Sequence, residues 1–396
     1  MAADPATSRP DGPNASGELS ERLQTIRLVD HHVHGCWLSD GPRERFENAL
    51  NEANTDPLPE WDSAFDTQLG FAVRAHCAPL LDLPPHAGPD AYWARRAELG
   101  EATVAERLLP AAGVDDWVVD TGFGDEICSP GQLASIAGGT GHTVLRLEAL
   151  AEQALPAGPD YARNFAGLLE AETDRQAAVG FKTVIAYRTG FAVDWSEPSS
   201  TAVNEAARRW ADRGGRRLDD PLLLCFGIRT ALALQTERLA TDGAGLPLQF
   251  HVGFGDRDED LGRTDPLLLL PLLRDPIATN ASIVLLHCYP YERQAGYLAQ
   301  AFAGVHLDVG LAVNHLGGRS RELLARSLEL APFRKLLYSS DAYGPAELHY
   351  LGAQLWRTGT AAVLASFVAD GHWSAADALR VADLIASTNA RRLYRL

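Results

Sequence analysis

Three histidines stand within four residues near the start of the chain, directly after a short apolar run. The stretch reads Ile26-Arg-Leu-Val-Asp-His-His-Val-His-Gly35. Because residues two apart in a β-strand point to the same face, His32 and His34 would project their imidazoles to one side. Two such imidazoles are a bidentate start to a metal site. The pattern alone fits a hydrogen-bonded polar turn equally well, so the rest of the chain decides between the two.

Composition and charge exclude some classes of protein. Hydrophobic residues make up 46% of the 396 residues and charged residues 22%, as in a soluble globular protein with a large core. The formal net charge is -17, whereas a nucleic-acid-binding protein is expected to carry a basic face. We therefore expect a small-molecule substrate and no nucleic-acid partner.

The sequence also shows no sign of export or of membrane insertion. The first residues form neither a basic n-region nor an apolar h-region, and no apolar run reaches the length of a membrane span. The five cysteines are odd in number, scattered and never spaced as CxxC, so neither a disulfide framework nor a zinc knuckle is indicated. We expect a cytoplasmic protein without a membrane partner, and a homodimer is compatible with the sequence.

Seven further strand-like runs follow the first, and stretches rich in Ala, Leu, Glu and Arg separate most of them. This alternation predicts a parallel sheet covered by helices. Eight strands in one chain predict an α/β fold of the (β/α)8 TIM-barrel type. The seven runs are 117–120, 143–148, 181–187, 246–251, 282–287, 305–308 and 335–341.

The remaining stretches suggest how the chain is divided. We expect residues 1–19, which are rich in Pro, Ala, Gly, Ser and Asp, to form a disordered tail, and residues 20–396 to form the barrel. The stretch 36–114 is too long for a plain loop and predicts a helical insertion or lid after the first strand. No G-x-G-x-x-G motif follows any strand, which argues against a dinucleotide-binding sheet.

Polar side chains end most of the apolar runs. Active sites of such barrels lie at the C-terminal ends of the strands. A single buried histidine there is equally well explained by a hydrogen bond to a backbone carbonyl, but the joint pattern favours a site. The residues are His32, His34, Asp120, Glu148, Arg188, His251, His287 and Asp341.

The order of these residues resembles the metal-dependent amidohydrolase superfamily. The resemblance spans about residues 26–396. In detail, the chain is similar to the amidohydrolase-type N-terminal domains of glutamine-synthetase-like fusion proteins, and more distantly to metal-dependent decarboxylases. It implies the fold and a metal strongly but the substrate poorly, because barrel loops vary freely. The motifs that carry it are His32-Val-His34, Phe250-His-Val-Gly-Phe-Gly-Asp256, Leu285-Leu-His-Cys-Tyr-Pro290, Tyr338-Ser-Ser-Asp-Ala342 and Asn389-Ala-Arg-Arg-Leu-Tyr394.

The resemblance implies that His32, His34, His251 and Asp341 surround a divalent metal ion. Such an ion keeps an open position for water and lowers the pKa of that water toward neutrality. Asp341 would carry a proton from the water to the leaving group. His287 would either ligate a second ion or, as we favour, stay unligated and polarise the substrate carbonyl. The N/O ligand set favours one zinc ion per chain, with Mn, Fe or Ni as alternatives.

Lys182 decides whether there are one or two ions. Two-metal members of the superfamily often carry a bridging carbamylated lysine on the fourth strand. In the run Phe181-Lys-Thr-Val-Ile-Ala-Tyr187, Lys182 begins far below the strand's end, and only a shorter strand would bring it to the metal. We therefore favour a buried lysine paired with a carboxylate over a bridging ligand.

Other residues are candidates for the wall of the pocket or for contact with substrate. Arg188 would end the fourth strand, where its planar fork suits a substrate carboxylate, or a salt bridge to Asp120 or Glu148. Asp308 would support a ligand histidine from behind. Less specific candidates are Gln68, Arg74 and His76 in the insertion, and Trp37 and Tyr289 beside presumed ligands.

These observations favour a metal-dependent hydrolase that cleaves a C–N bond of a small, acidic substrate. The alternative keeps fold and metal but is a non-oxidative decarboxylase of an unsaturated or aromatic acid, and the two share every residue named. A catalytically inactive barrel that serves as a binding module would have an eroded ligand set, whereas all the expected residues are present here.

Overall fold

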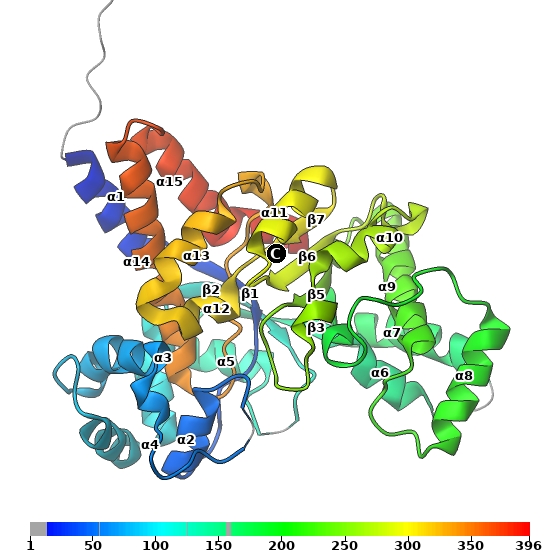
Figure 1. Ribbon diagram of the computed structural model, residues 1–396, viewed down its shortest axis with the longest axis horizontal. Coiled ribbons are helices and arrows are strands. Elements are labelled where there is room, and N and C mark those ends of the chain that lie inside the picture. The colour runs from blue at the N-terminus through cyan, green and yellow to red at the C-terminus, as the bar shows by residue number, and fades with distance from the viewer. Residues whose placement is uncertain (1–13, 55, 125, 156–159) are drawn as a thin grey trace, which may run out of the picture.

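Seven parallel strands form one curled sheet in the computed structural model, which describes residues 14–54, 56–124, 126–155 and 160–396. The strands lie side by side in chain order, so each pairs with its sequence neighbours, and helices lie between most consecutive strands (Figure 1). This confirms the predicted α/β fold with a parallel sheet. The strands are β1 (Leu28–Val33), β2 (Val114–Asp120), β3 (Thr140–Arg146), β4 (Gly180–Thr183), β5 (Leu248–Val252), β6 (Ile283–His287) and β7 (Val305–Leu307).

The predicted eighth strand over 335–341 does not form a regular strand. Its segment lies between the two edge strands: Leu337 donates a backbone hydrogen bond to Leu307 of β7, and the backbone N–H of His31 in β1 donates to Tyr338. With β7 the segment forms one bridge, at Leu336. On the β1 side, the buried Asp30 carboxylate accepts hydrogen bonds from the backbone and hydroxyl of Ser340, and the backbone N–H of Asp341 donates to His32. The segment thus joins the sheet edges without continuous pairing.

Two other predicted strands are too long at their C-terminal ends. β3 ends at Arg146, so Glu148 lies in the first turn of helix α6 rather than at a strand end. β4 ends at Thr183, and a 3-10 turn over Ile185–Tyr187 follows. The Thr183 hydroxyl accepts a hydrogen bond from the backbone N–H of Ile185, which turns the chain away from the ladder. Arg188 therefore lies beyond this turn.

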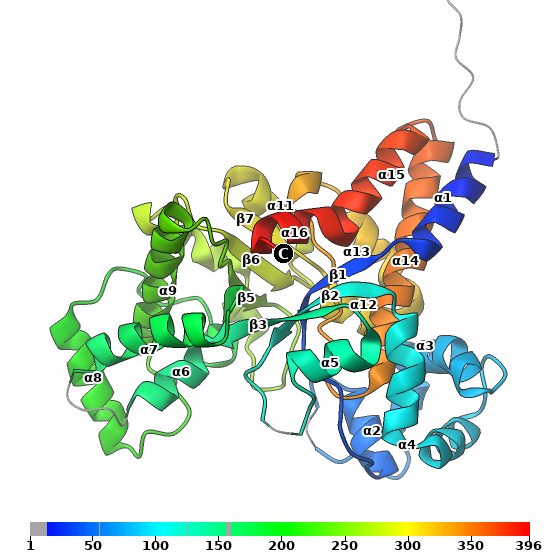
Figure 2. The same cartoon turned by 180° about the vertical axis from the view of Figure 1, so that it is seen from behind.

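Helices surround the sheet on its outer side and form two lobes beside it (Figures 1 and 2). The α-helices α5 to α9 are α5 (Pro130–Ala137), α6 (Leu147–Ala154), α7 (Tyr161–Arg175), α8 (Ser200–Asp212) and α9 (Pro221–Thr241). Those that follow β5 are α10 (Leu270–Leu273), α11 (Glu292–Ala301), α12 (Gly310–Leu316), α13 (Ser320–Ser327), α14 (Ala346–Ala369), α15 (Ala375–Asp383) and α16 (Asn389–Tyr394). One lobe consists of α6 to α9.

The chain between β1 and β2 forms the opposite lobe and is helical in the structure. It contains α2 (Arg43–Ala49), α3 (Gln68–Ala72), α4 (Pro89–Ala111) and the short helices η1 (Ala64–Asp66), η2 (Val73–Cys77) and η3 (Ala78–Leu81). The predicted disordered tail is wrong for residues 14–19, which belong to helix α1 (Asn14–Thr25). Residues 1–13 of that prediction lie outside the described residues.

Local sequence explains where several helices begin. Ser129 caps α5 with a full capping box, since its side chain accepts from the backbone of Gln132 and the Gln132 side chain accepts from the backbone of Ser129. Ser199 and Asp220 cap α8 and α9, and each accepts a hydrogen bond from the first helical turn. These caps place the helices of the lobe directly after their loops.

The core has two parts. A large apolar cluster lies between the sheet and its helices, and a small one lies inside the curled sheet. The small cluster combines Val29, Val118, Val144, Val284 and Leu286 of the strands with side chains of α16. The C-terminal helix thus closes one end of the sheet's interior, which leaves the other end for a site.

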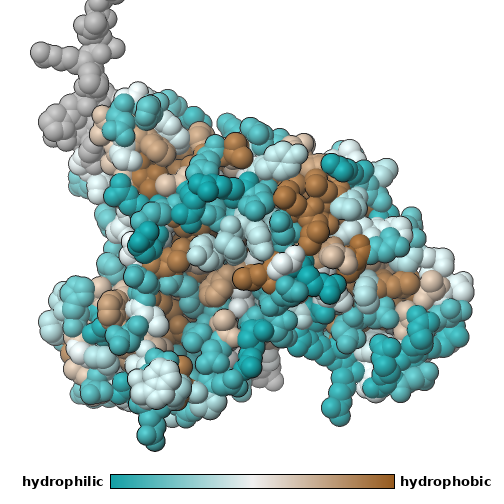
Figure 3. Space-filling model, viewed as in Figure 1, coloured by the Kyte–Doolittle hydropathy of each residue, from teal (hydrophilic) through white to brown (hydrophobic). Residues whose placement is uncertain are grey.

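The face of the molecule seen in Figure 3 is largely hydrophilic, with separate apolar patches. Within the described part of the chain, we find no helix that combines the length and the apolar character needed to span a membrane.

Candidate metal centre

Three histidines and one carboxylate meet at the C-terminal end of the sheet. His32 and His34 come from β1 and the residue after it, and His287 ends β6. The Asp341 carboxylate lies among them: its Oδ1 is 3.0 Å from His32 Nε2 and 3.3 Å from His34 Nε2, and its Oδ2 is 3.2 Å from His287 Nε2. The strand ends thus bring these predicted site residues together.

Hydrogen bonds behind the two β1 imidazoles indicate their tautomer. His32 Nδ1 lies 2.9 Å from the side-chain oxygen of Gln249, whose own NH2 group donates to the His31 carbonyl. His34 Nδ1 lies 3.2 Å from the backbone carbonyl of Asp120. Both Nδ1 atoms therefore carry the proton, and both Nε2 atoms direct a lone pair at Asp341.

This arrangement fits a bound divalent cation. A bare imidazole lone pair and a carboxylate oxygen 3.0 Å apart repel one another, and a cation between them removes the repulsion. Asp341 Oδ1 and both ring nitrogens of His287 are buried and have no hydrogen-bond partner among the described residues. The ligand atoms of His32, His287 and Asp341 lie within 4.8 Å of one another, as do those of His32, His34 and Asp120. N/O donors at this spacing suit a transition-metal ion.

Burial keeps His32 and His287 in the neutral form that a metal ligand requires. It lowers the pKa of His32 to about 4, with a further contribution from the charge of Lys182. Burial also lowers the pKa of His287 well below its usual range. For Asp341 burial acts in the opposite direction, but the attraction of His287 and His32 outweighs it and keeps the pKa of this carboxyl well below its usual range. The pocket therefore holds neutral imidazoles around a carboxylate.

Backbone strain also concentrates at this centre. His287, Cys288 and Asp341 all have positive φ, at 68°, 52° and 50°. Such conformations are unfavourable for residues other than glycine and tend to cluster where side chains serve a ligand or a reaction.

His251, the remaining predicted ligand, lies beside this group rather than within it. Its ring centroid is 4.8 Å from that of His287. The Tyr187 hydroxyl lies 2.9 Å from its Nε2 atom, and Glu259 Oε2 lies 3.4 Å from the same atom. Sequence reasoning missed both partners, since Tyr187 read as a strand residue and Glu259 lies in a loop without a motif. The ligand role of His251 stays a prediction.

Lys182 lies closer to the centre than the sequence indicated. Because β4 is short, Lys182 is its penultimate residue, and its Nζ atom is 3.3 Å from His32 Nε2. Burial lowers the pKa of Lys182 to about 8, although Asp341 and Asp120 favour its charged form. The expected depth below the site is wrong, and the argument against a bridging role no longer holds.

The neighbouring carboxylates Asp120, at the end of β2, and Glu148, in the first turn of α6, have different partners. Asp120 accepts two hydrogen bonds from Arg146, at 2.6 and 3.2 Å, and Glu148 accepts from the Thr183 hydroxyl at 2.6 Å. Arg188 therefore pairs with neither: the nearest carboxylate is Glu152, at 3.9 Å. Its Nε and Nη1 atoms are buried without a hydrogen-bond partner among the described residues.

A pocket of about 690 Å³ opens at this centre. His34, Lys182, His251, Asp341 and Arg188 all line it. The helical segment after β1 also contributes, but through residues that sequence reasoning did not single out, namely Asn48, Asn51, Glu52 and Asn54.

Several less specific predictions are not borne out by the pocket's lining. Gln68, Arg74, His76, Trp37 and Tyr289 are not among the described lining residues. Trp37 instead stacks beneath the Arg45 guanidinium, 4.1 Å from the ring centroid. Asp308 does support the site from behind, although its side chain binds His31 and the backbone N–H of His287.

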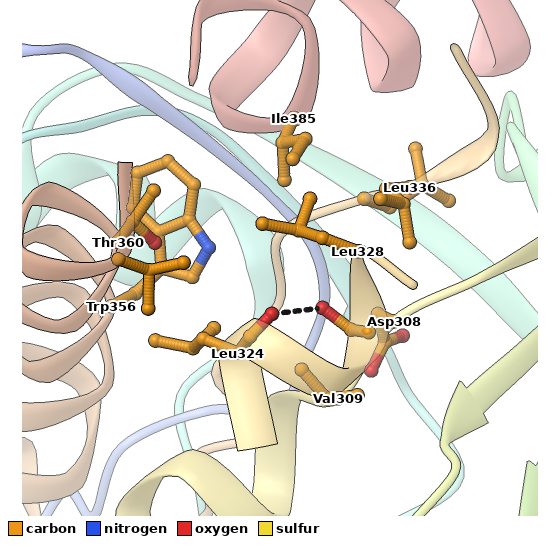
Figure 4. A pocket seen from close by; sticks show the side chains of 11 residues that line it. Asp308, Val309, Leu324, Leu328, Leu336, Trp356, Thr360 and Ile385 are labelled. Atoms are coloured by element: carbon orange, nitrogen blue, oxygen red, sulfur yellow. Dashed lines mark hydrogen bonds between the residues drawn. The ribbon is translucent and has the colours of Figure 1, made fainter. Parts of the chain in front are cut away.

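A second cavity beside Asp308 is too small for a substrate. Its volume is about 20 Å³, close to the space of one water molecule, and mostly apolar side chains line it (Figure 4). It lies between the end of β7 and α13 and α14, among Val309, Leu324, Trp356 and Ile385.

Comparisons with known proteins agree with this architecture. A family model described as amidohydrolase matches residues 142–396. Protein fluG of Emericella nidulans is 33% identical over 242 residues, which are 60% of this chain but 28% of that protein, so the chain spans less than a third of this relative. A crystal structure of a candidate metal-dependent hydrolase from Lactobacillus casei is 26% identical with a TM-score of 0.82, covering 95% of this chain and 97% of that one. A uronate isomerase from Bacillus halodurans, 13% identical with a TM-score of 0.64, covers 98% of both chains and shares the fold.

Proposed function

The chain belongs to the amidohydrolase family, and on this premise we propose that it is a metal-dependent hydrolase that cleaves a C–N bond of a small, acidic substrate. One observation carries the proposal: the unpartnered atoms of Asp341 and His287 face His32, whose lone pair the Gln249 contact directs at them. We propose that His32, His34, His251 and Asp341 hold one divalent ion per chain, with zinc favoured by the N/O donors.

The residues of the chain divide the chemistry among them. When bound, the ion lowers the pKa of a water molecule toward neutrality and so supplies the nucleophile. Asp341, whose carboxyl group is ionised, accepts a proton from the attacking water and passes it to the leaving amine. His287 lies 3.2 Å from Asp341 and polarises the substrate carbonyl. His287 is buried and the Asp341 side chain is 8% exposed, which limits the access of competing bulk water to both.

Arg188 binds the acidic group of the substrate in this proposal. The Nε and Nη1 atoms of its fork are buried without a hydrogen-bond partner among the described residues, and its nearest carboxylate is 3.9 Å away. We predict that Arg188→Met raises KM for an acidic substrate by about 10-fold or more, since a charge-assisted hydrogen bond contributes roughly 1.5–3 kcal/mol. Steady-state kinetics on an acidic substrate and on its neutral amide analogue measure this. Equal KM values for wild type and variant on the acidic substrate would remove Arg188 from the site.

The main test is a substrate panel of amides and carboxylic acids, assayed in parallel for released amine and released bicarbonate. The proposal expects amine release that depends on a divalent ion and disappears in Asp341→Asn. Bicarbonate release without amine release would instead establish the decarboxylase chemistry that the same residues permit.

The number of ions is a separate prediction that rests on Lys182. With one ion, Lys182→Met leaves the metal content at about one equivalent per chain, because His32, His34 and Asp341 remain. Plasma mass spectrometry on wild type and variant measures the stoichiometry. A fall from about two equivalents to about one would show that Lys182 bridges two ions.

A further inference from the structure

The pocket wall carries two separate sets of charged groups. Arg146, Arg188 and Arg217 form one set, with Lys182 beside them. The lining carboxylates Glu152 and Asp258 lie next to Arg188 and Arg217 in this set. Glu52 and Asp256 lie in the other, with the buried Glu259 next to them. We call these the basic pole and the acidic pole.

Among the arginines of the basic pole, Arg188 is the one without a close carboxylate partner in the described part of the chain. Arg146 is held by Asp120 at 2.6 Å, and Arg217 is held by Asp258 at 2.6 Å. Arg188 has no carboxylate closer than 3.9 Å. Burial lowers the pKa of Arg188, and the positive charge of Arg217 lowers it further, so an anion bound here would relieve repulsion among the arginines.

The acidic pole lacks a strong positive partner within the described ranges. Glu259 has a side chain only 2% exposed, and both of its carboxylate oxygens are without a hydrogen-bond partner. The nearest basic groups are imidazoles: His251 lies 3.4 Å from Glu259, and His315 lies 4.0 Å from Glu52. The buried Glu259 carboxylate has no strong cationic partner among the described residues, whereas Glu52 is partly exposed and Asp256 is exposed. A buried carboxylate without such a partner is unfavourable, so this side of the pocket is complementary to a cation.

Local packing holds the acidic pole in place. A Cβ atom on Gly255 would lie 2.3 Å from the Tyr187 hydroxyl, 2.6 Å from His251 Nε2 and 2.9 Å from Glu259 Oε2. The backbone before Asp256 is therefore pressed against these three side chains. Burial raises the pKa of Glu52 to about 8, and the charges of Asp341, Asp256 and Glu259 add to this, as expected for carboxylates that share one wall.

We propose that the pocket binds a substrate with two opposite charges, a carboxylate at Arg188 and a protonated amine at Glu52 and Asp256, with the charge of Glu259 behind them. The inference deepens the proposed function and rests on it for the reaction, because the scissile bond would lie between these two groups. An organic cation fits the acidic pole better than a bare metal ion. In the described part of the chain, the clusters of closely spaced metal-ligating atoms include none of Glu52, Asp256 and Glu259.

Binding of matched probes to the metal-loaded protein tests the proposal without turnover. The probes are ω-amino carboxylates from β-alanine to 8-aminooctanoate, each compared with the monocarboxylate and the alkylamine of equal length by isothermal titration calorimetry. At the best length, we expect the amino acid to bind at least about 10-fold more tightly than either singly charged probe. Equal affinities of amino acid and monocarboxylate at every length would overturn the proposal.

Two variants separate the poles. Glu52→Gln should remove the advantage of the amino group, and Arg188→Met should remove the advantage of the carboxylate. Glu106→Gln, on the exposed side of α4, is the matched control and should change neither. The proposal would be contradicted if the amino group still increased the affinity in both Glu52→Gln and Asp256→Asn. It would also be contradicted if the wild type bound a second equivalent of divalent ion that Glu52→Gln abolished, because the acidic pole would then be a metal site. If the enzyme hydrolyses amides but does not bind the amino carboxylates more tightly than the singly charged probes, this inference is wrong and the proposed function stands. If it binds the amino carboxylates more tightly but hydrolyses no amide, the proposed function is wrong and this inference about binding stands.

Discussion

Two layers of buried polar groups lie one above the other inside the curled sheet, and they are satisfied in different ways. In the lower layer, His31 contacts Asp308 at 2.8 Å and the Tyr394 hydroxyl at 3.1 Å, while Gln249 binds the same hydroxyl at 2.8 Å. In the upper layer, Asp341 and His287 keep buried polar atoms without hydrogen-bond partners among the described residues.

The difference separates a structural role from a ligand-binding one. Complete pairing makes a buried polar layer rigid, whereas unpaired buried atoms are costly unless a ligand completes them. Neighbouring histidines of one motif divide between the layers: His31 belongs to the lower and His32 to the upper. Gln249 joins the two, because its oxygen lies 2.9 Å from His32 Nδ1. The lower layer thus orients the ligands of the upper.

The largest effect is expected from removing the β1 imidazoles of the upper layer. In the variant His32→Ala/His34→Ala, we expect bound divalent ion to fall from about one equivalent per chain to none, and kcat/KM to fall by about 1000-fold or more. Plasma mass spectrometry and the amine-release assay measure the two effects. Full metal content in this variant would mean that the unpaired atoms of the upper layer do not mark a metal site. The assignment of a ligand-binding role to the upper layer would then be wrong.

The two layers should also differ in pH dependence in the metal-free protein. The pKa of His32 is about 4 in the folded chain against 6.5 for an ordinary histidine, so the unfolded chain binds more protons between these values. Stability should therefore fall as the pH drops from about 6.5 to about 4, by up to roughly 3 kcal/mol for this group. For Asp308, burial acts to raise the pKa, but the hydrogen bond and charge of His31 outweigh burial and lower it. The contribution of Asp308 to the free energy of unfolding is therefore lost only as the pH falls below 3.8, the usual aspartate pKa.

Urea unfolding of the chelator-treated protein at pH 7 and pH 4.5 tests this order. His32→Asn should lose less stability on acidification than wild type, since the titrating group is gone. His306 and His349 also have pKa values lowered to about 4. The total loss of unfolding free energy in the wild type should therefore be larger than the part that His32 contributes. An identical decline in wild type and His32→Asn would show that the upper layer does not titrate in this window.

The sequence predicted the α/β fold with a parallel sheet, and the proximity of His32, His287 and Asp341, because those signals are local. Apolar runs with polar ends identify strands and their C-terminal residues, which is how His32, His287 and Asp341 could be grouped. The expected C-terminal ends of β3 and β4 were wrong. Residues 184–187 are as apolar and β-branched as a strand yet form a helical turn, and residues 147–148 begin helix α6. That error displaced Glu148 and Arg188 from strand ends.

Long-range pairing could not be predicted in the same way. Gln249 looks like an ordinary residue of an apolar strand, and nothing near it indicates that it meets Tyr394 from the far end of the chain. The acidic pole likewise combines Glu52 with Asp256 and Glu259, which are separated by about two hundred residues and share no motif. Such groups form only when the sheet curls, so their proximity is a property of the fold.

The smallest expected effect comes from one hydroxyl of the lower layer. Tyr394→Phe leaves Gln249 and His31 each without one partner, which should cost about 1–2 kcal/mol of unfolding free energy. It should also weaken metal binding by about 10-fold, because Gln249 then holds His32 less firmly. Tyr338→Phe is the matched control: its hydroxyl is buried without a hydrogen-bond partner in the described chain, so its loss should be neutral or stabilising and leave metal affinity unchanged. Competition with a chromophoric chelator measures the affinities. If Tyr394→Phe lowers stability but not metal affinity, the lower layer supports the fold without orienting the ligands above it.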